Sequence, residues 1–287
     1  MSESSLSALE QQLNAQFAER LVALPTGAQV AWREAGDSRR DFAVVMLHGI
    51  SSGAASWLGV VQQLQALQPG LRVLAWDAPG YGASTALAAA APTDADYAQV
   101  LAQSLKALGV QRCLLVGHSL GALMVSRFAV DAPDMVQQLV LISPAGGYGA
   151  PAKAEQQAKV RSGRLASLAD KGVAGLAAVI DQRLVSEHGS DLARQWVRWN
   201  AARMNAGGYA QAVELLCGSD LGRAAGKLPM PVQVWVGEHD VVTTPAACQA
   251  WSEQLGAQQY ATLAAAGHAS PVEQPVEIAQ RLATLLK

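Results

Sequence analysis

A lone serine stands between two apolar runs in the segment CLLVGHSLGALMVSRFAV, residues 113–130. The pattern Gly-x-Ser-x-Gly is typical of a serine on a strained turn between a strand and a helix, where the hydroxyl projects beyond the strand end. Gly117 and Gly121 suit such a turn, because a Cβ at either position would collide with neighbouring chain. The segment therefore predicts that Ser119 acts as a nucleophile.

A serine hydroxyl attacks poorly until a base removes its proton, so the chain needs a suitably placed base. His268 is the candidate, because it follows the last expected strand in AAAGHASPVEQP, where a loop can bring its ring over the serine. Asp240, which ends VWVGEHD after the preceding strand, is the candidate acid, and Glu238 is the competing carboxylate. The chain order Ser, Asp, His supports a triad of Ser119, Asp240 and His268.

Acyl transfer also requires N–H groups that stabilise a developing oxyanion. The backbone amide of Leu120, directly after the serine, is one expected donor. The other is the amide of Ile50 in LHGISSG, residues 47–53, where an expected strand ends in His-Gly. His48 is expected to hold that turn through hydrogen bonds.

Short apolar runs alternate with helical patterns over the first half of the chain, which predicts a mostly parallel, doubly wound α/β sheet. The expected strands are residues 29–36, 41–49, 72–80, 112–119, 138–146, 231–240 and 258–268. Residues 148–227 are helical in pattern, without a clear strand, and are expected to form a helical cap. The cap thus divides an α/β core into residues 25–147 and 228–287.

Residues 1–24 are expected to form an N-terminal helix. Apolar side chains recur there at helical spacing, at Leu6, Leu9, Leu13 and Phe17, and Ser7 with Glu10 fits a capping box. Such an amphipathic helix either docks on the core or contacts a second copy of the chain, so a homodimer is possible.

The composition excludes several classes of function. The 287 residues are 51% hydrophobic and 15% charged, with a formal net charge of -2. Without a Lys/Arg cluster, nucleic-acid binding is not expected, and no apolar run is long enough to span a membrane. The start of the chain lacks a secretory signal, and three distant cysteines lack metal-ligand spacing, so we expect a reduced, cytoplasmic protein. The cysteines are Cys113, Cys217 and Cys248.

Five segments together resemble the α/β-hydrolase fold superfamily: LHGIS, WDAPGYGAS, VGHSLG, GEHD and AGHASPVEQP. Within it, the chain is similar to bacterial esterases, enol-lactonases and meta-cleavage C–C hydrolases. It departs from the last group, which typically carries Gly-Asn-Ser-Met-Gly-Gly around the serine and an aromatic residue after the histidine, where this chain has GHSLGA and Ala269. By the same analogy, Asp77 in WDAPGYGAS is expected to fix its loop.

The resemblance implies a serine hydrolase that cleaves a small carboxylic ester or lactone through an acyl-enzyme, with no metal or cofactor. One alternative is C–C bond hydrolysis of a dienoic keto acid by the same triad. Another is a ligand receptor that keeps the fold but does not turn over.

Side chains of the cap are the candidates for substrate contact. Trp196, Trp199 and Met204 follow helical spacing, a pattern that more often marks the core of a cap than contact with substrate. Arg198 could bind a substrate carboxylate. Arg161, Arg164 and Arg203 are further candidates for that ion pair.

Overall fold

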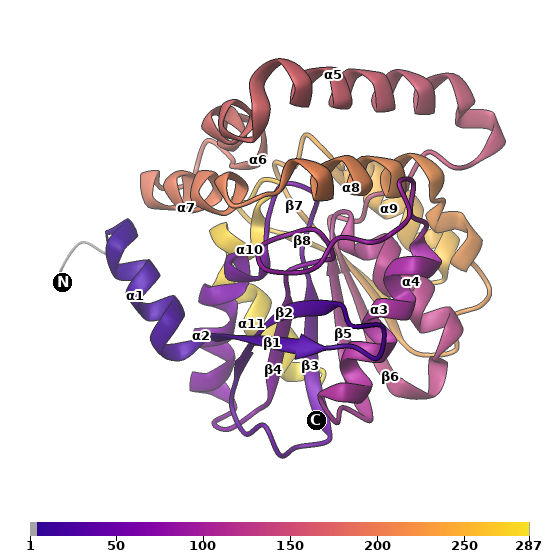
Figure 1. Cartoon of the computed structure of the whole chain (residues 1–287). Helices are drawn as coiled ribbons and strands as arrows, with labels where there is room; N and C mark the ends of the chain where they lie inside the picture. Colours follow the sequence, from indigo (N-terminus) through magenta and orange to yellow (C-terminus); the bar gives the residue numbers. More distant parts are fainter. Residues whose placement is uncertain (1–4, 287) are drawn as a thin grey trace.

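The computed structural model describes residues 5–286, in which one sheet of eight strands runs through the molecule in the order β1-β2-β4-β3-β5-β6-β7-β8 (Figure 1). The strands are β1 Ala18–Ala23, β2 Gln29–Ala35, β3 Phe42–Leu47, β4 Val73–Trp76, β5 Arg112–His118, β6 Val136–Ile142, β7 Val232–Gly237 and β8 Gln259–Leu263. β1 and β2 pair antiparallel with their neighbours, and all other pairings are parallel. The predicted α/β fold class is therefore confirmed.

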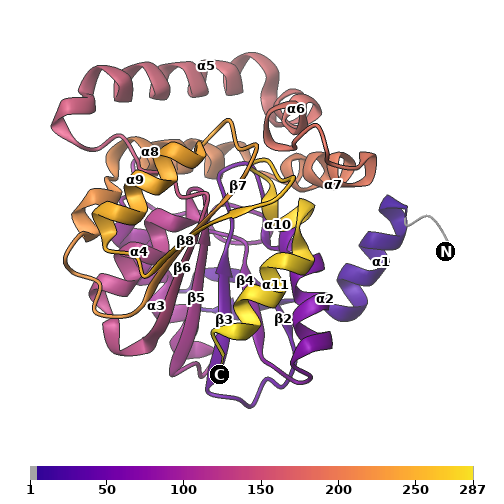
Figure 2. The same ribbon diagram turned by 180° about the vertical axis from the view of Figure 1, so that it is seen from behind.

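Helices cover both faces of the sheet, with α3 and α4 on one and α2 and α11 on the other (Figures 1 and 2). Outside the cap, the helices are α1 Leu6–Gln16, α2 Leu58–Leu67, α3 Asp94–Ala107, α4 Gly121–Asp131, α9 Pro245–Leu255, α10 Ser270–Glu273 and α11 Pro275–Thr284. The inner strands are buried along nearly their whole length, as expected for parallel strands packed on both faces. This packing fixes the positions of the strand ends, where the candidate residues lie.

The N-terminal prediction needs correction in two respects. The helix ends at Gln16, and residues 18–23 form the edge strand β1, which pairs with β2; residues 1–4 lie outside the described part. Ser5 caps the helix by accepting a hydrogen bond from the amide of Ala8, so the capping box proposed for Ser7 and Glu10 is wrong. The helix docks on the core of its own chain, where Leu13 and Phe17 are buried. The homodimer remains a prediction.

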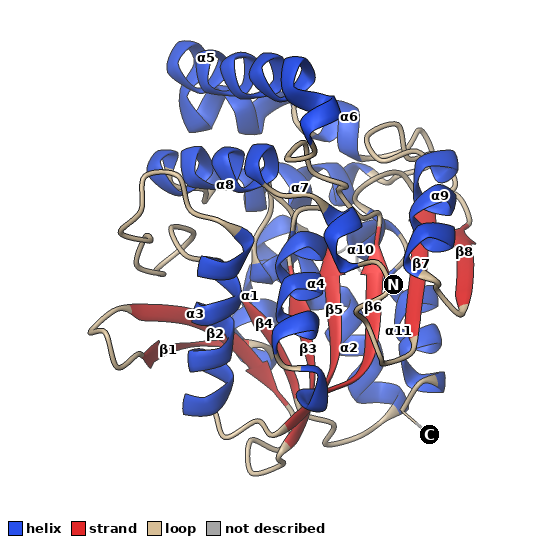
Figure 3. Ribbon diagram, turned by 90° about the vertical axis from the view of Figure 1, so that its right-hand side faces the viewer, coloured by secondary structure: helices blue, strands red, loops and turns tan. Residues whose placement is uncertain are grey.

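Four helices lie over the carboxyl ends of the parallel strands, and we name them the cap helices (Figure 3). They are α5 Ala154–Val179, α6 Asp181–Leu184, α7 Asp191–Ala202 and α8 Ala206–Gly218. α5 is interrupted at Gly172, whose φ of 61° lies in the left-handed region that glycine tolerates best. An ion pair between Arg161 and Glu214, 2.9 Å apart, joins α5 to α8.

None of the described helices is both long and apolar enough to cross a membrane.

Candidate active site

Ser119 occupies the turn between β5 and α4 with a φ of 52°, which is unusual for any residue other than glycine. The glycines on either side of the serine have no room for a side chain. A Cβ at Gly117 would lie 2.4 Å from Val125 Cγ2, and one at Gly121 would lie 2.6 Å from the carbonyl oxygen of Leu47. Only glycine fits at these two positions. The sequence therefore forces the strained turn that lifts the serine hydroxyl beyond the sheet.

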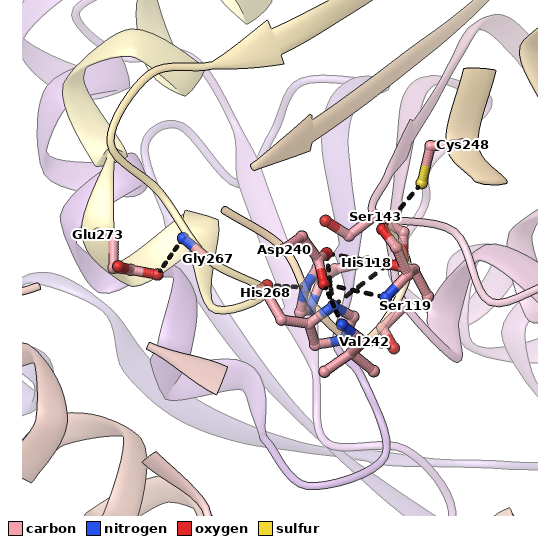
Figure 4. A network of polar contacts seen from close by, with 10 residues as sticks. His118, Ser119, Ser143, Asp240, Val242, Cys248, Gly267, His268 and Glu273 are labelled. Atoms are coloured by element: carbon pink, nitrogen blue, oxygen red, sulfur yellow. Dashed lines mark hydrogen bonds and ion pairs between the residues drawn. The ribbon is translucent and has the colours of Figure 1, made fainter. Parts of the chain in front are cut away.

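Ser119, His268 and Asp240 form one chain of hydrogen bonds (Figure 4). His268 Nε2 lies 2.9 Å from Ser119 Oγ, and His268 Nδ1 lies 2.8 Å from Asp240 Oδ2. A carboxylate only accepts hydrogen bonds, so Nδ1 carries the proton and donates it to Asp240. The lone pair of Nε2 is then free to accept the proton of the serine hydroxyl.

Asp240 accepts hydrogen bonds from the backbone as well as from the imidazole of His268. Its Oδ1 accepts hydrogen bonds from the amides of Val242 and Thr243 at 2.8 and 2.9 Å, and the side chain is fully buried. Burial by itself raises the pKa of Asp240, but the charge of His268 and these hydrogen bonds outweigh burial and lower it to about 2. Glu238, the competing acid, is exposed and accepts a hydrogen bond from the amide of Ala265.

The lowered pKa of Asp240 predicts a specific loss of stability in acid. A group whose folded pKa is about 2, against 3.8 for the free side chain, contributes stability above pH 4 that is lost as the pH falls through 2. The loss is about 2 kcal/mol in the free energy of unfolding. Asp240→Asn cannot titrate, so urea unfolding between pH 4 and pH 2 should show a correspondingly smaller loss in that variant. Equal losses in both proteins would show that the carboxylate is not stabilised in the fold.

Two residues that sequence reasoning missed support this arrangement. The Nε2–H of His118 donates to the carbonyl oxygen of His268 at 2.8 Å, and burial and the nearby His268 lower the pKa of His118 to about 3, so it stays neutral. The Thr243 hydroxyl lies 2.9 Å from Asp240 Oδ2 and 3.0 Å from the carbonyl oxygen of Ser143. The sequence offers one clue to each role: His118 directly precedes the serine, and Thr243 follows the acid by three residues.

The loop after β3 approaches the serine closely, since a Cβ at Gly49 would lie 3.0 Å from Ser119 Cβ. His48 holds this loop: its Nε2 accepts from the amide of Ala78 at 3.0 Å, so its Nδ1–H donates to the carbonyl oxygen of Gly49 at 2.7 Å. The Tyr81 hydroxyl donates to the carbonyl oxygen of Ile50 at 2.6 Å. The loop is thereby fixed with Ile50 beside the serine.

Asp77 also acts on this loop. Its Oδ1 accepts a hydrogen bond from the amide of Ala54 at 2.8 Å, which agrees with the structural role expected for it. It does not line the cavity above the serine.

A cavity of about 290 Å³ opens above Ser119 between the sheet and the cap helices. Ile50, Leu120 and His268 line it together with the serine, so the structure brings all these predicted residues together. Within residues 5–286, neither the Ile50 nor the Leu120 amide donates a hydrogen bond to another group of the chain. Two N–H donors are therefore free to bind an oxygen placed near Ser119.

The cavity has a positive lining. Lys153, Arg164 and Arg183 line it, and among the described residues no carboxylate side chain does. Arg164 donates to the Tyr209 hydroxyl, whereas the Arg183 guanidinium has no ion-pair partner in the described chain. Sequence reasoning missed Lys153 and Arg183, because a basic residue in a helical stretch carries no signal of the face it occupies.

Trp196, Trp199, Arg198 and Met204, four of the cap residues expected to contact the substrate, do not line this cavity. Trp196 is buried and stacks on Trp199 with ring centroids 4.5 Å apart, and Arg203 lies over the Trp199 ring. Arg198 forms an ion pair with Asp181 at 2.7 Å. Met204 is buried and pairs through its backbone with Tyr81.

Arg161 is likewise absent from the lining and is engaged by Glu214, so of the arginines considered from the sequence only Arg164 reaches the cavity.

Comparison with curated proteins identifies relatives over part of the chain. The 2-hydroxy-6-oxononadienedioate/2-hydroxy-6-oxononatrienedioate hydrolase of Burkholderia vietnamiensis is 37% identical over 112 residues, which are 39% of this chain and 38% of that protein. The chain thus matches well under half the length of this relative.

Solved structures are similar over nearly the whole chain. The enol-lactonase from Burkholderia xenovorans LB400 has a TM-score of 0.81 at 22% identity, covering 93% of this chain and 99% of that one. A thermophilic esterase from Thermogutta terrifontis has a TM-score of 0.79 at 22% identity, covering 93% and 97%. Identities this low show the shared fold alone.

The family comparison extends over most of the sequence. A family model described as the alpha/beta hydrolase fold matches residues 43–275, a range that includes the serine turn, the acid and the histidine. The chain therefore belongs to the alpha/beta hydrolase fold family.

Proposed function

We propose that the protein is a serine hydrolase that cleaves a small carboxylic ester or lactone through an acyl-enzyme. The observation that carries the proposal is the buried hydrogen-bond chain from Ser119 through His268 to Asp240, which ends in a cavity beside two free N–H groups. At about 290 Å³ the cavity is at the small end of ligand pockets, which favours a small substrate.

The geometry supports the following mechanism. Ser119 attacks the carbonyl carbon while His268 Nε2 takes its proton, and the Ile50 and Leu120 amides stabilise the oxyanion. His268 then gives the proton to the leaving alcohol, and Asp240 holds the imidazolium by accepting its Nδ1–H. Water then attacks the acyl carbon as His268 takes its proton. The C–O bond to Ser119 breaks, His268 returns the proton to the serine oxygen, and the acid leaves.

A substrate panel tests this function. Purified protein should turn over esters of graded acyl length and lactones, with the shortest acyl groups preferred because the cavity is small. Sustained multiple turnover would also exclude a receptor that only binds. If neither esters nor lactones are hydrolysed, the ester or lactone proposal is wrong.

A second candidate is hydrolysis of a C–C bond in a dienoic keto acid. Two observations favour it: the positive lining formed by Lys153, Arg164 and Arg183, and the name of a partial relative, which specifies a dioate substrate. The same triad supports this reaction. Turnover of a ring-cleavage product without activity on simple aryl esters would decide in its favour.

For either reaction, the lining predicts a preference for substrates that carry a carboxylate. Arg183→Gln should raise the KM for such a substrate about tenfold, because one charge-assisted hydrogen bond at an exposed position contributes about 1.5 kcal/mol. The kcat should change little, since Arg183 is not part of the hydrogen-bond chain around Ser119.

Two controls accompany the measurement. A neutral ester of similar size should be hydrolysed equally by both proteins, and Arg127→Gln, which removes a surface arginine paired with Asp131 outside the cavity, should leave both KM values unchanged. An unchanged KM for carboxylate substrates in Arg183→Gln and in Arg164→Gln would contradict the anionic preference.

We also propose that the protein works in a reducing compartment, the cytoplasm. Cys113, Cys217 and Cys248 are all buried free thiols. Burial raises the pKa of Cys113 and of Cys248 to about 12, so these sulfurs remain protonated and unreactive.

A further inference from the structure

Two histidines from distant parts of the chain meet at the surface beside the cap. His188 lies in the segment between α6 and α7, and His239 lies in the turn after β7, directly before Asp240. Their ring centroids are 4.8 Å apart, with an interplanar angle of 59°. Together with a carboxylate oxygen of Glu187, their nitrogen atoms form a group in which all ligand atoms lie within 4.8 Å of one another.

The backbones that carry these side chains are firmly held. The Ser186 hydroxyl donates to Glu273 at 2.7 Å and accepts from the amide of His188 at 3.2 Å. These bonds fix the segment between α6 and α7, residues 185–190, which we call the cap segment. The amide of His239 donates to the carbonyl oxygen of Ala266 at 2.8 Å, which fixes the turn after β7. The two imidazoles are thus brought together by the fold rather than by their own contact.

The ring nitrogens are available to a ligand. His188 Nε2 lies 3.8 Å from Glu187 Oε1, and His239 Nε2 lies 3.7 Å from Glu238 Oε2, and both distances are too long for a hydrogen bond. In the described part of the chain, no other group forms a hydrogen bond with either ring. Glu238 adds a second negative charge beside the cluster, which favours a cation.

We propose that Glu187, His188 and His239 bind a divalent transition-metal ion, with Zn²⁺ the best match to two imidazole nitrogens and one carboxylate oxygen. Tetrahedral Zn²⁺ with bonds of about 2.1 Å needs ligand atoms roughly 3.4 Å apart, so ligand atoms that lie up to 4.8 Å apart must approach by as much as about 1.4 Å. Their exposure permits this: the side chains of Glu187, His188 and His239 are 80%, 49% and 37% exposed. Water completes the fourth position.

The site would connect the cap to the core. Glu187 and His188 belong to the cap segment, whereas His239 belongs to the turn that continues into Asp240. Hydrogen bonds already join the cap side to residues after β8, where the Ala269 amide donates to the carbonyl oxygen of Leu184 at 2.8 Å. A bound ion would add a direct link to the turn after β7 that carries His239. Metal binding should therefore stabilise the folded protein and reduce opening of the cap segment. This inference does not depend on the proposed reaction.

Calorimetric titration of the chelator-treated full-length chain with ZnCl₂ tests the site. We expect one ion per chain, a Tm that rises with Zn²⁺ concentration, and slower amide hydrogen exchange in residues 185–190. His188→Ala and His239→Ala should each weaken binding by more than roughly tenfold, and the double variant should lose it. MgCl₂ should have no such effect, because Mg²⁺ prefers oxygen ligands.

A matched control separates the site from general effects of charge. Glu155→Gln removes an exposed carboxylate near the start of α5 and should bind Zn²⁺ like the wild type, whereas Glu187→Gln should bind it more weakly. Both histidines are at the surface, so their alanine variants should retain the Tm of the metal-free wild type. Absence of stoichiometric binding in the wild type, or binding that persists in the double variant, would overturn the proposal.

Discussion

Replacing Ser119 with alanine is expected to reduce kcat for ester or lactone hydrolysis by roughly 10⁵-fold to 10⁶-fold while leaving the fold intact. The Ser119 oxygen lies 2.9 Å from His268 Nε2, so this is the hydroxyl that the base can activate for attack on a carbonyl carbon. The free amides of Ile50 and Leu120 remain, so a residual rate of about 10³-fold over water is expected.

The experiment combines kinetics with covalent labelling. A fluorophosphonate probe should add one label to the wild type, located at Ser119 by peptide mapping, and none to Ser119→Ala. Ser52→Ala is the matched control, because Ser52 also lines the cavity but has no hydrogen bond to His268. Thermal denaturation should show similar Tm values for all three proteins. Undiminished labelling of Ser119→Ala, or loss of labelling in Ser52→Ala alone, would contradict the assignment of the nucleophile.

The parts of the molecule that could be predicted from sequence are those where the local pattern determines the geometry. A buried parallel strand requires an unbroken apolar run, as in residues 113–116, and the turn at Ser119 requires glycine on both sides. Because parallel strands end at one edge of the sheet, the residues that follow β5, β7 and β8 were bound to converge. The positions of Ser119, Asp240 and His268 follow from this reasoning.

The N-terminal strand β1 was missed because its residues show no strand pattern. In AERLVA only Val22 is buried, and an edge strand with one paired side does not need alternating apolar side chains. Leu21 and Leu24 continue the helical spacing of Leu13 and Phe17, so the helical pattern was extended too far. Pairing with β2, a contact with a later segment, decides the structure there.

The sequence predicts that the cap is helical, but it does not predict which face of each cap helix meets the cavity. Trp196 and Trp199 have the spacing of a helix face, and the spacing is the same whether that face meets substrate or protein. In the structure it meets protein, and the charges of the cavity come instead from Lys153, Arg164 and Arg183. Which side of a cap helix faces the cavity depends on how the cap packs over the sheet, which no local pattern encodes.

The second large expected effect on kcat comes from replacing Asp240, the carboxylate hydrogen-bonded to His268, rather than the nearby Glu238. Asp240→Asn is expected to lower kcat about 10⁴-fold, whereas Glu238→Gln should change it by no more than about twofold. Asp240 accepts the Nδ1–H of His268, which leaves the Nε2 lone pair directed at Ser119. An asparagine amide at this position can donate to Nδ1, which moves the imidazole proton to Nε2 and removes the base.

Glu238 is a demanding control because it lies two residues from Asp240 and carries the same charge. Its carboxylate is exposed and, within residues 5–286, accepts a hydrogen bond only from the amide of Ala265, 3.2 Å away. Its removal therefore leaves the imidazole of His268 untouched. Both variants lose one negative charge, and a general electrostatic effect would therefore lower kcat equally in both. Steady-state kinetics on one ester at neutral pH, with the Tm of each variant measured in parallel, distinguish the two cases. Comparable losses of kcat in Asp240→Asn and Glu238→Gln would show that orientation of His268 by Asp240 is not what sustains the reaction.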